Sequence, residues 1–381
     1  MATRGRWAGA GVMAIGVLLV AGGCTEKKAA SSDGSVQEVP VALSDTGCEP
    51  NSMSAKAGAT TFTVSNEDSS DVTEFEIFPP DKSRVLGEVE NVGPGLTRSF
   101  SMNLDAGSYI TWCPGGSKEY GTLEVAEANT GQTGDPAAQQ AAVATYLEYV
   151  QKQADEGVVR GQKFADAVKA GDLAKAQSLF AYAREPYESI EPIAESFGDL
   201  DPEIDAREGD VPAEEWTGFH RIEQALWVDQ TTAGMAPLAD KLVTDLTTLR
   251  DSIATVELEP AQIANGAVEL LNEVSASKIT GEEDRYSHTD LADFDANVAG
   301  AKAAFDSVVP LLADDQADLV VTINDRFEAL DAALAVYKVP GGPANGFVLY
   351  TDLTPAQTAE LSASVDALAE PLSKVAALVL Q

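Results

Sequence analysis

The sequence predicts two folded parts in series, an N-terminal β-sandwich followed by an all-α helical bundle. Residues 36–126 contain short β-branched or alternating runs separated by Gly, Pro, Asn and Asp turns. Residues 137–381 are instead rich in alanine and carry apolar positions at helical spacing. A chain of 381 residues is long enough for each part to bury its own core.

The N-terminus has the layout of a bacterial export signal. Two arginines precede an apolar run over residues 7–20, and Ala-Gly-Gly then leads to Cys24. The run is too short for a stop-transfer helix. We expect residues 1–23 to be a signal peptide, Cys24 to be lipidated, and residues 24–35 to form a flexible tether. The mature protein is then expected in the periplasm or on the outer face of the cytoplasmic membrane.

The chain is strongly acidic. Its formal net charge is −36, from 61 acidic and 25 basic residues. The charge becomes about −38 once the signal peptide leaves with its two arginines. Nucleic acid is excluded as a partner, because its phosphates would be repelled. Such a surface suits cations, but it also serves solubility alone.

Several short runs in the first part predict the strands of a β-sandwich. These runs are residues 39–43, 60–65, 73–78, 97–104, 109–113 and 122–125.

The predicted sandwich also contains two cysteines, Cys48 and Cys113. In an oxidising compartment they form a disulfide or, alternatively, bind a metal. Glu74 and Glu76 lie two residues apart on one predicted strand, so their side chains share a face of the sheet. A metal site of Cys48, Glu74 and Cys113 and a disulfide-stapled sandwich with solvated acids are both consistent with this pattern.

Residues 127–136 form a linker by composition, and a helical bundle follows. Breaks with Gly or Pro separate most of the expected helices. These helices are residues 137–169, 173–197, 213–228, 237–255, 260–278, 290–312, 316–337 and 354–380.

One of these helices carries a histidine and a glutamate on an aromatic stripe. Trp216, His220, Glu223 and Trp227 fall at i, i+4, i+7 and i+11, so the stripe is expected to face inward. A buried His and a carboxylate need a partner, and a metal ion is a candidate. A satisfied core pair is the alternative.

Other acids precede this helix. Glu188 and Glu191 lie three residues apart at the margin of a buried helix face, with no basic residue between them. The repulsion within such a like-charge pair is unfavourable. A cation bound between the two carboxylates would make their interaction favourable. If this helix packs antiparallel to the helix that carries His220, the two glutamates and Asp205 in the intervening loop come close to His220. For this helix alone, the alternative is a solvated acidic face.

A third candidate segment is the acidic loop 278–290, which contains the second histidine, His288. Its alternative interpretation is an ordinary loop with a helix N-cap at Ser287 or Thr289.

The segment His220-Arg-Ile-Glu223 resembles the His-x-x-Glu motif of the imelysin-like (M75) helical-bundle family. Segments 184–195 and 278–291 resemble its EfeO-type branch, whose longer members carry a cupredoxin-like domain before the bundle. The end of the sandwich, Tyr109-Ile-Thr-Trp-Cys-Pro-Gly-Gly, is similar to the last loop of cupredoxins. No His or Met follows Cys113 there, so a blue-copper centre is not available.

This resemblance implies an exported lipoprotein that captures iron in the bundle. It would deliver the iron to an Efe-type membrane permease, beside a haem-dependent (DyP-type) peroxidase of the same system. By motif match, the iron ligands are Glu188, Glu191, Asp205, His220, Glu223 and Glu283. The cupredoxin-like domain would bind copper or iron through Cys48, Glu74 and Cys113.

Two enzyme classes compete with this non-enzymatic function. An M75-type metallopeptidase needs a metal, an open coordination position and a general base. The motif from His220 to Glu223 supplies two ligands and no obvious base, and the His-Glu-x-x-His motif is absent. The other class is a copper or iron redox protein of ferroxidase type. A purely structural surface protein is a further alternative.

Overall fold

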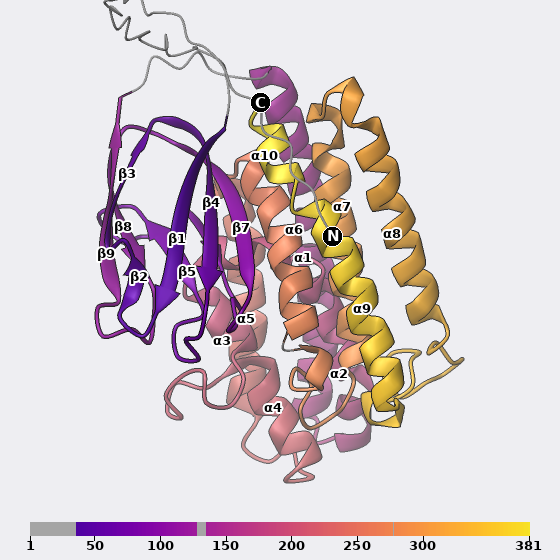
Figure 1. The fold of residues 1–381 in the computed structure, drawn as a ribbon. Coiled ribbons are helices and arrows are strands. Elements are labelled where there is room, and N and C mark those ends of the chain that lie inside the picture. Colours follow the sequence, from indigo (N-terminus) through magenta and orange to yellow (C-terminus); the bar gives the residue numbers. More distant parts are fainter. Residues whose placement is uncertain (1–35, 128–134, 277) are drawn as a thin grey trace, which may run out of the picture. The chain divides into compact units, whose positions relative to one another are not determined.

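The computed structural model describes residues 36–127, 135–276 and 278–381 (Figure 1). The predicted signal peptide, the tether with Cys24 and most of the predicted linker lie outside the described residues. None of the helices in the described ranges combines the length and apolarity that crossing a bilayer needs.

The first part is a β-sandwich, as the sequence predicts. One sheet has the strand order β2-β1-β4-β7 and the other β3-β9-β8-β5-β6. The strands are β1 (Gln37–Ser44), β2 (Gly47–Glu49), β3 (Ser52–Lys56), β4 (Gly58–Asn66), β5 (Phe75–Phe78), β6 (Gly87–Val89), β7 (Thr97–Leu104), β8 (Gly107–Trp112) and β9 (Tyr120–Ala126).

Alternating burial builds the sandwich core. Along β9, Leu123 and Val125 face inward while their neighbours are exposed. Phe62 stacks on Phe100 with ring centroids 5.2 Å apart, and Phe75 lies within 6.0 Å of both. β1 runs parallel to β4 and β3 runs parallel to β9, whereas the other pairs are antiparallel.

The second part is helical, which confirms the predicted bundle. Its α-helices are α1 (Pro136–Lys169), α2 (Leu173–Glu188), α3 (Leu200–Asp205), α4 (Gly218–Trp227), α5 (Ala236–Ser252), α6 (Pro260–Ala276), α7 (Asp290–Val308), α8 (Ala317–Ala335), α9 (Pro355–Leu372) and α10 (Val375–Val379). Short 3₁₀ turns extend or link several of them, among them η1 (Glu191–Phe197) and η3 (Lys278–Thr280).

The predicted helix over residues 173–197 is wrong as one continuous element. α2 ends at Glu188, and a separate 3₁₀ segment begins at Glu191. Pro192 has no N–H to donate and disfavours the α conformation at the residue before it. The two glutamates therefore lie on either side of a break.

The predicted helix around His220 begins later than expected. α4 begins at Gly218, where the backbone has φ of 77° and a Cβ would lie 2.1 Å from the carbonyl oxygen of Ile204. Only glycine fits this position. Trp216 thus precedes the helix instead of extending its stripe, and its Nε1 donates to the carbonyl of Ala206 at 2.7 Å.

Candidate metal centre

A buried group of carboxyl side chains surrounds His220 in the bundle. We call it the acidic core; its side chains are at most 15% exposed. They come from α2, η1, α3, α4, α7 and the loop before α7. The acidic core comprises Glu188, Glu191, Asp205, Glu223, Glu283, Asp284, Asp290 and Asp293.

Asp205, His220 and Glu283 form the first possible metal-binding group. They offer ligand atoms that all lie within 4.8 Å of one another. Nε2 of His220 is 3.3 Å from Oε1 of Glu283 and 3.6 Å from Oδ1 of Asp205. Within the described part of the chain, this nitrogen has no well-formed hydrogen bond. Two carboxylates and an imidazole suit a transition-metal ion.

A second possible group contains His220, Glu223 and Asp284. Nδ1 of His220 lies 3.0 Å from Oε2 of Glu223. Sequence reasoning missed Asp284. It stands beside Glu283 in the acidic loop, but no spacing in that loop distinguishes the two acids.

Arg184 lies at the centre of the acidic core and is fully buried. Its guanidinium donates to Glu188 and Asp205, and to Glu283 at 2.9 Å and Asp293 at 3.0 Å. Burial lowers the pKa of Arg184, but these carboxylates raise it well above its usual value. Sequence reasoning missed this residue, although an arginine four residues before Glu188 on a helix is a recognisable ion pair.

Lys278 was also missed, and it changes how Glu188 and Glu191 are interpreted. Its ammonium lies 3.2 Å from Oε2 of Glu188 and also bonds Glu191. The side-chain amide of Asn297 donates to both glutamates, at 3.0 Å and 2.6 Å. The two glutamates are therefore not an unpaired acidic pair. In the described ranges, the groups of residues that could hold a metal do not include them.

The acidic core has more carboxyl groups than basic partners. Within the described residues, the basic side chains in contact with these eight carboxyl groups are Arg184, Lys278, Arg207 and His220. A polyvalent cation would reduce this imbalance.

The pKa values reflect the same imbalance. Burial raises the pKa of Asp205 to about 6, although Arg184 and His220 lower it. Burial likewise raises the pKa of Asp290 to about 7. Burial and Arg184 lower the pKa of His220, but the carboxylates around it, first that of Asp205, raise it to about 9.

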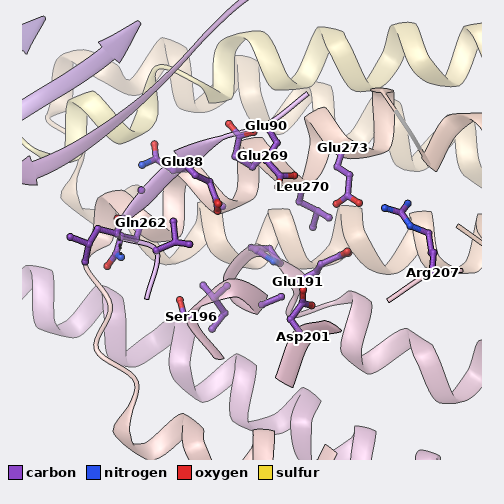
Figure 2. A pocket seen from close by; sticks show the side chains of 18 residues that line it. Glu88, Glu90, Glu191, Ser196, Asp201, Arg207, Gln262, Glu269, Leu270 and Glu273 are labelled. Atoms are coloured by element: carbon purple, nitrogen blue, oxygen red, sulfur yellow. Dashed lines mark hydrogen bonds between the residues drawn. The ribbon is translucent and has the colours of Figure 1, made fainter. Parts of the chain in front are cut away.

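A cavity of about 270 Å³ adjoins the acidic core (Figure 2). Glu191, Asp201 and Glu273 line it, together with Arg207, whose Nη1 lies 3.2 Å from Oε2 of Glu283. Glu191, a member of the acidic core, and Arg207, which contacts it, thus also line the cavity. The cavity is an open volume beside a cluster of otherwise enclosed carboxylates.

In the sandwich, Cys48 and Cys113 are joined in a disulfide. This is one of the two alternatives that the sequence leaves open. Glu74 lies instead in a possible metal-binding group with Glu76 and Glu88. The predicted set of Cys48, Glu74 and Cys113 does not exist with free thiolates in this structure, because the two sulfurs are bonded to each other.

The fold and the site together define a class of protein. It has a β-sandwich followed by a helical bundle with a candidate metal centre of buried histidine and carboxylates. The family model described as imelysin matches residues 142–375, and that described as a cupredoxin-like domain matches residues 12–125. The chain belongs to the imelysin (M75) family and carries a cupredoxin-like domain.

Its relatives include the iron uptake system component EfeO of Escherichia coli K12, which is 39% identical over 347 residues. That match covers 89% of this chain and 91% of the relative. The proteins of the same name from Escherichia coli O157:H7 and Shigella flexneri match equally well. Among solved structures, auracyanin B aligns with 23% of this chain and 88% of its own, at 18% identity and a TM-score of 0.21.

Proposed function

We propose that this chain is the exported iron-binding component of an Efe-type iron-uptake system. It holds iron in the acidic core and passes it to a membrane permease, beside a haem-dependent peroxidase of the same system. One observation carries the proposal. The buried group of Asp205, His220 and Glu283 occurs in a chain that is 39% identical to iron uptake component EfeO.

The ligand set supports a transition metal over calcium or magnesium. Carboxylate oxygens are hard ligands that suit all of these ions. The imidazole of His220 shifts the preference toward iron or a neighbouring transition metal. Glu188 and Glu191 add negative charge next to the group, and they become further ligands if an incoming cation displaces Lys278 from them.

The cavity provides an access route for the ion. His220 and Glu283 are at most 4% exposed at their side chains, so a cation cannot reach them directly from solvent. It enters instead through the acidic cavity and passes Glu191 and Arg207. An acidic lining favours a cation along this route.

The N-terminal segments support a function outside the cytoplasm. Residues 1–23 are removed as a signal peptide, and a lipid on Cys24 tethers the chain to the membrane. In the sandwich, copper or iron binding by Cys48, Glu74 and Cys113 requires reduction of the disulfide. In the oxidised form, the candidate ligands there are the carboxylates of Glu74, Glu76 and Glu88.

Equilibrium dialysis against ferrous iron without oxygen and against ferric citrate tests the proposal on the mature chain without its lipidated cysteine, which begins at residue 25. The bundle is expected to retain about one iron ion per chain in at least one of the two conditions. Asp205→Asn and Glu283→Gln are each expected to lose most of this iron. Undiminished iron in both variants would refute the assignment.

A further inference from the structure

We propose that Glu223 positions His220 and does not bind the metal, so that Nε2 of His220 holds the cation together with Asp205 and Glu283. This inference rests on the proposed iron-binding function. It assigns different roles to the two residues of the His-x-x-Glu motif.

The first observation is the contact between the two side chains. His220 and Glu223 lie three residues apart on α4, and Nδ1 of the imidazole is 3.0 Å from Oε2 of the carboxylate. The side chain of Glu223 is fully buried and that of His220 is 2% exposed. A neutral imidazole with its Nδ1 proton bonded to a carboxylate has only Nε2 left to bind a metal.

The second observation is that both carboxylate oxygens of Glu223 have partners, two of which are backbone N–H groups. Its Oε1 accepts hydrogen bonds from the backbone N–H of Tyr286 at 3.0 Å and of Ser287 at 2.7 Å. A turn of this carboxylate toward a metal would break bonds to backbone donors, of which that of Ser287 is buried. Unpaired buried donors are unfavourable.

The third observation concerns the opposite edge of the ring. Nε2 of His220 is buried, and no well-formed hydrogen bond to it exists within the described residues. It faces Oε1 of Glu283 at 3.3 Å and Oδ1 of Asp205 at 3.6 Å, and both oxygens also accept a hydrogen bond from Arg184. Ligand atoms that each lie about 2.1 Å from one ion are roughly 3–4 Å apart, so these separations fit a shared cation.

The same carboxylate also fixes the loop that supplies Glu283. Its two backbone hydrogen bonds tie residues 286 and 287 to α4. Glu223 therefore holds the imidazole and the neighbouring loop in one arrangement. In the competing arrangement, His220, Glu223 and Asp284 share the metal, and the contact between Nδ1 of His220 and Oε2 of Glu223 is lost.

Nitrogen NMR of the mature chain, labelled with ¹⁵N-histidine, tests the proposal. The sequence contains only two histidines, so the signals of His220 can be assigned by comparison with a His288→Asn variant. Zn²⁺ serves as the diamagnetic probe. We expect Zn²⁺ to shift Nε2 of His220 while Nδ1 keeps its proton. The response to Zn²⁺ itself is measured on the unsubstituted chain, and only the assignment uses the His288→Asn variant.

Three variants sharpen the test. Glu223→Gln is expected to weaken Zn²⁺ binding about tenfold and to change the Nδ1 signal. Asp205→Asn is expected to weaken binding more, with the Nδ1 signal of the metal-free protein retained. Asp284→Asn should have the smallest effect on affinity of the three.

Coordination of Zn²⁺ through Nδ1 would overturn the positioning role, and so would a larger loss of affinity in Asp284→Asn than in Asp205→Asn. In either case the bundle would remain a metal site, and the proposed function would stand. If neither nitrogen of His220 responds to Zn²⁺, the proposed function fails together with this inference.

Discussion

The imidazole of His220 lies between carboxylates on both of its edges. Nδ1 is 3.0 Å from Glu223, and Nε2 is 3.3 Å from Glu283. Burial and Arg184 oppose a charge on this ring, but the carboxylates around it raise the pKa of His220 to about 9. Without metal, the imidazole is therefore protonated at neutral pH.

Metal binding should release this proton. Below pH about 9, a cation that binds Nε2 must displace the proton from this nitrogen. The apparent metal affinity is therefore expected to rise with pH, by up to about tenfold per pH unit. Below pH about 6, protonation of Asp205, whose pKa burial raises to about 6, should weaken binding further. Calorimetric titration with Zn²⁺ in buffers of different ionisation enthalpy counts the released protons. An affinity independent of pH, without proton release, would contradict this account.

Lys278 should stabilise the metal-free bundle. It is 5% exposed and pairs with Glu188 and Glu191. Lys278→Met leaves these two carboxylates without that counter-charge, which is expected to lower the free energy of unfolding by about 3–5 kcal/mol. Urea titration of the metal-free protein measures the loss.

The matched control for this substitution is Lys338→Met. Lys338 is 49% exposed at its side chain and pairs with Asp295 on the surface. Such a pair contributes at most about 1 kcal/mol, so this variant should unfold close to the parent. Equal losses in the two variants would show that the buried position of Lys278 has no special role.

The disulfide between Cys48 and Cys113 should stabilise the sandwich. The two residues are 65 positions apart in the sequence, and a loop of this length corresponds to a stabilisation of about 4 kcal/mol. The oxidised mature chain should contain no titratable thiol before reduction, and the double variant Cys48→Ser/Cys113→Ser should unfold at lower urea. Two reactive thiols in the native, untreated protein would instead favour the metal alternative.

Filling the cavity should slow metal uptake. Ser196 lines the cavity but does not belong to the acidic core, so Ser196→Trp narrows the access route and leaves the ligands in place (Figure 2). Stopped-flow mixing with Zn²⁺ should show a lower association rate with a similar final occupancy. Ser178→Trp, at an exposed position of α2, is the control. Equal rates in both variants would argue for another route.

The fold could be predicted because its signals are local. Alternation along β9 and the helical spacing in the bundle follow from which side chains are buried, so both parts are confirmed. The residues at which the helices begin and end depend instead on single positions in the sequence. Pro192 interrupts the predicted helix over residues 173–197, and the backbone contact at Gly218 sets the start of α4.

The site could be predicted only in part. The His-x-x-Glu motif pointed to His220 and Glu223 as site residues, and the resemblance to the family added Glu283. Lys278 was not found because its contacts join distant segments, and for Arg184 only the pair with Glu188 four residues on is local. Arg184 and Asp293 are 109 residues apart in the sequence, and no local periodicity records such a pair. The ligand roles of Glu188 and Glu191 remain predictions.

The most direct test of the central claim compares iron binding in two histidine variants of the mature chain. His288 adopts a backbone φ of 58°, which asparagine tolerates, so His288→Asn is a conservative control. Competition with a chelator of known affinity should give the parent and His288→Asn the same iron affinity, and His220→Ala an affinity at least about tenfold weaker. Equal iron affinity in all three proteins would contradict an iron site at His220.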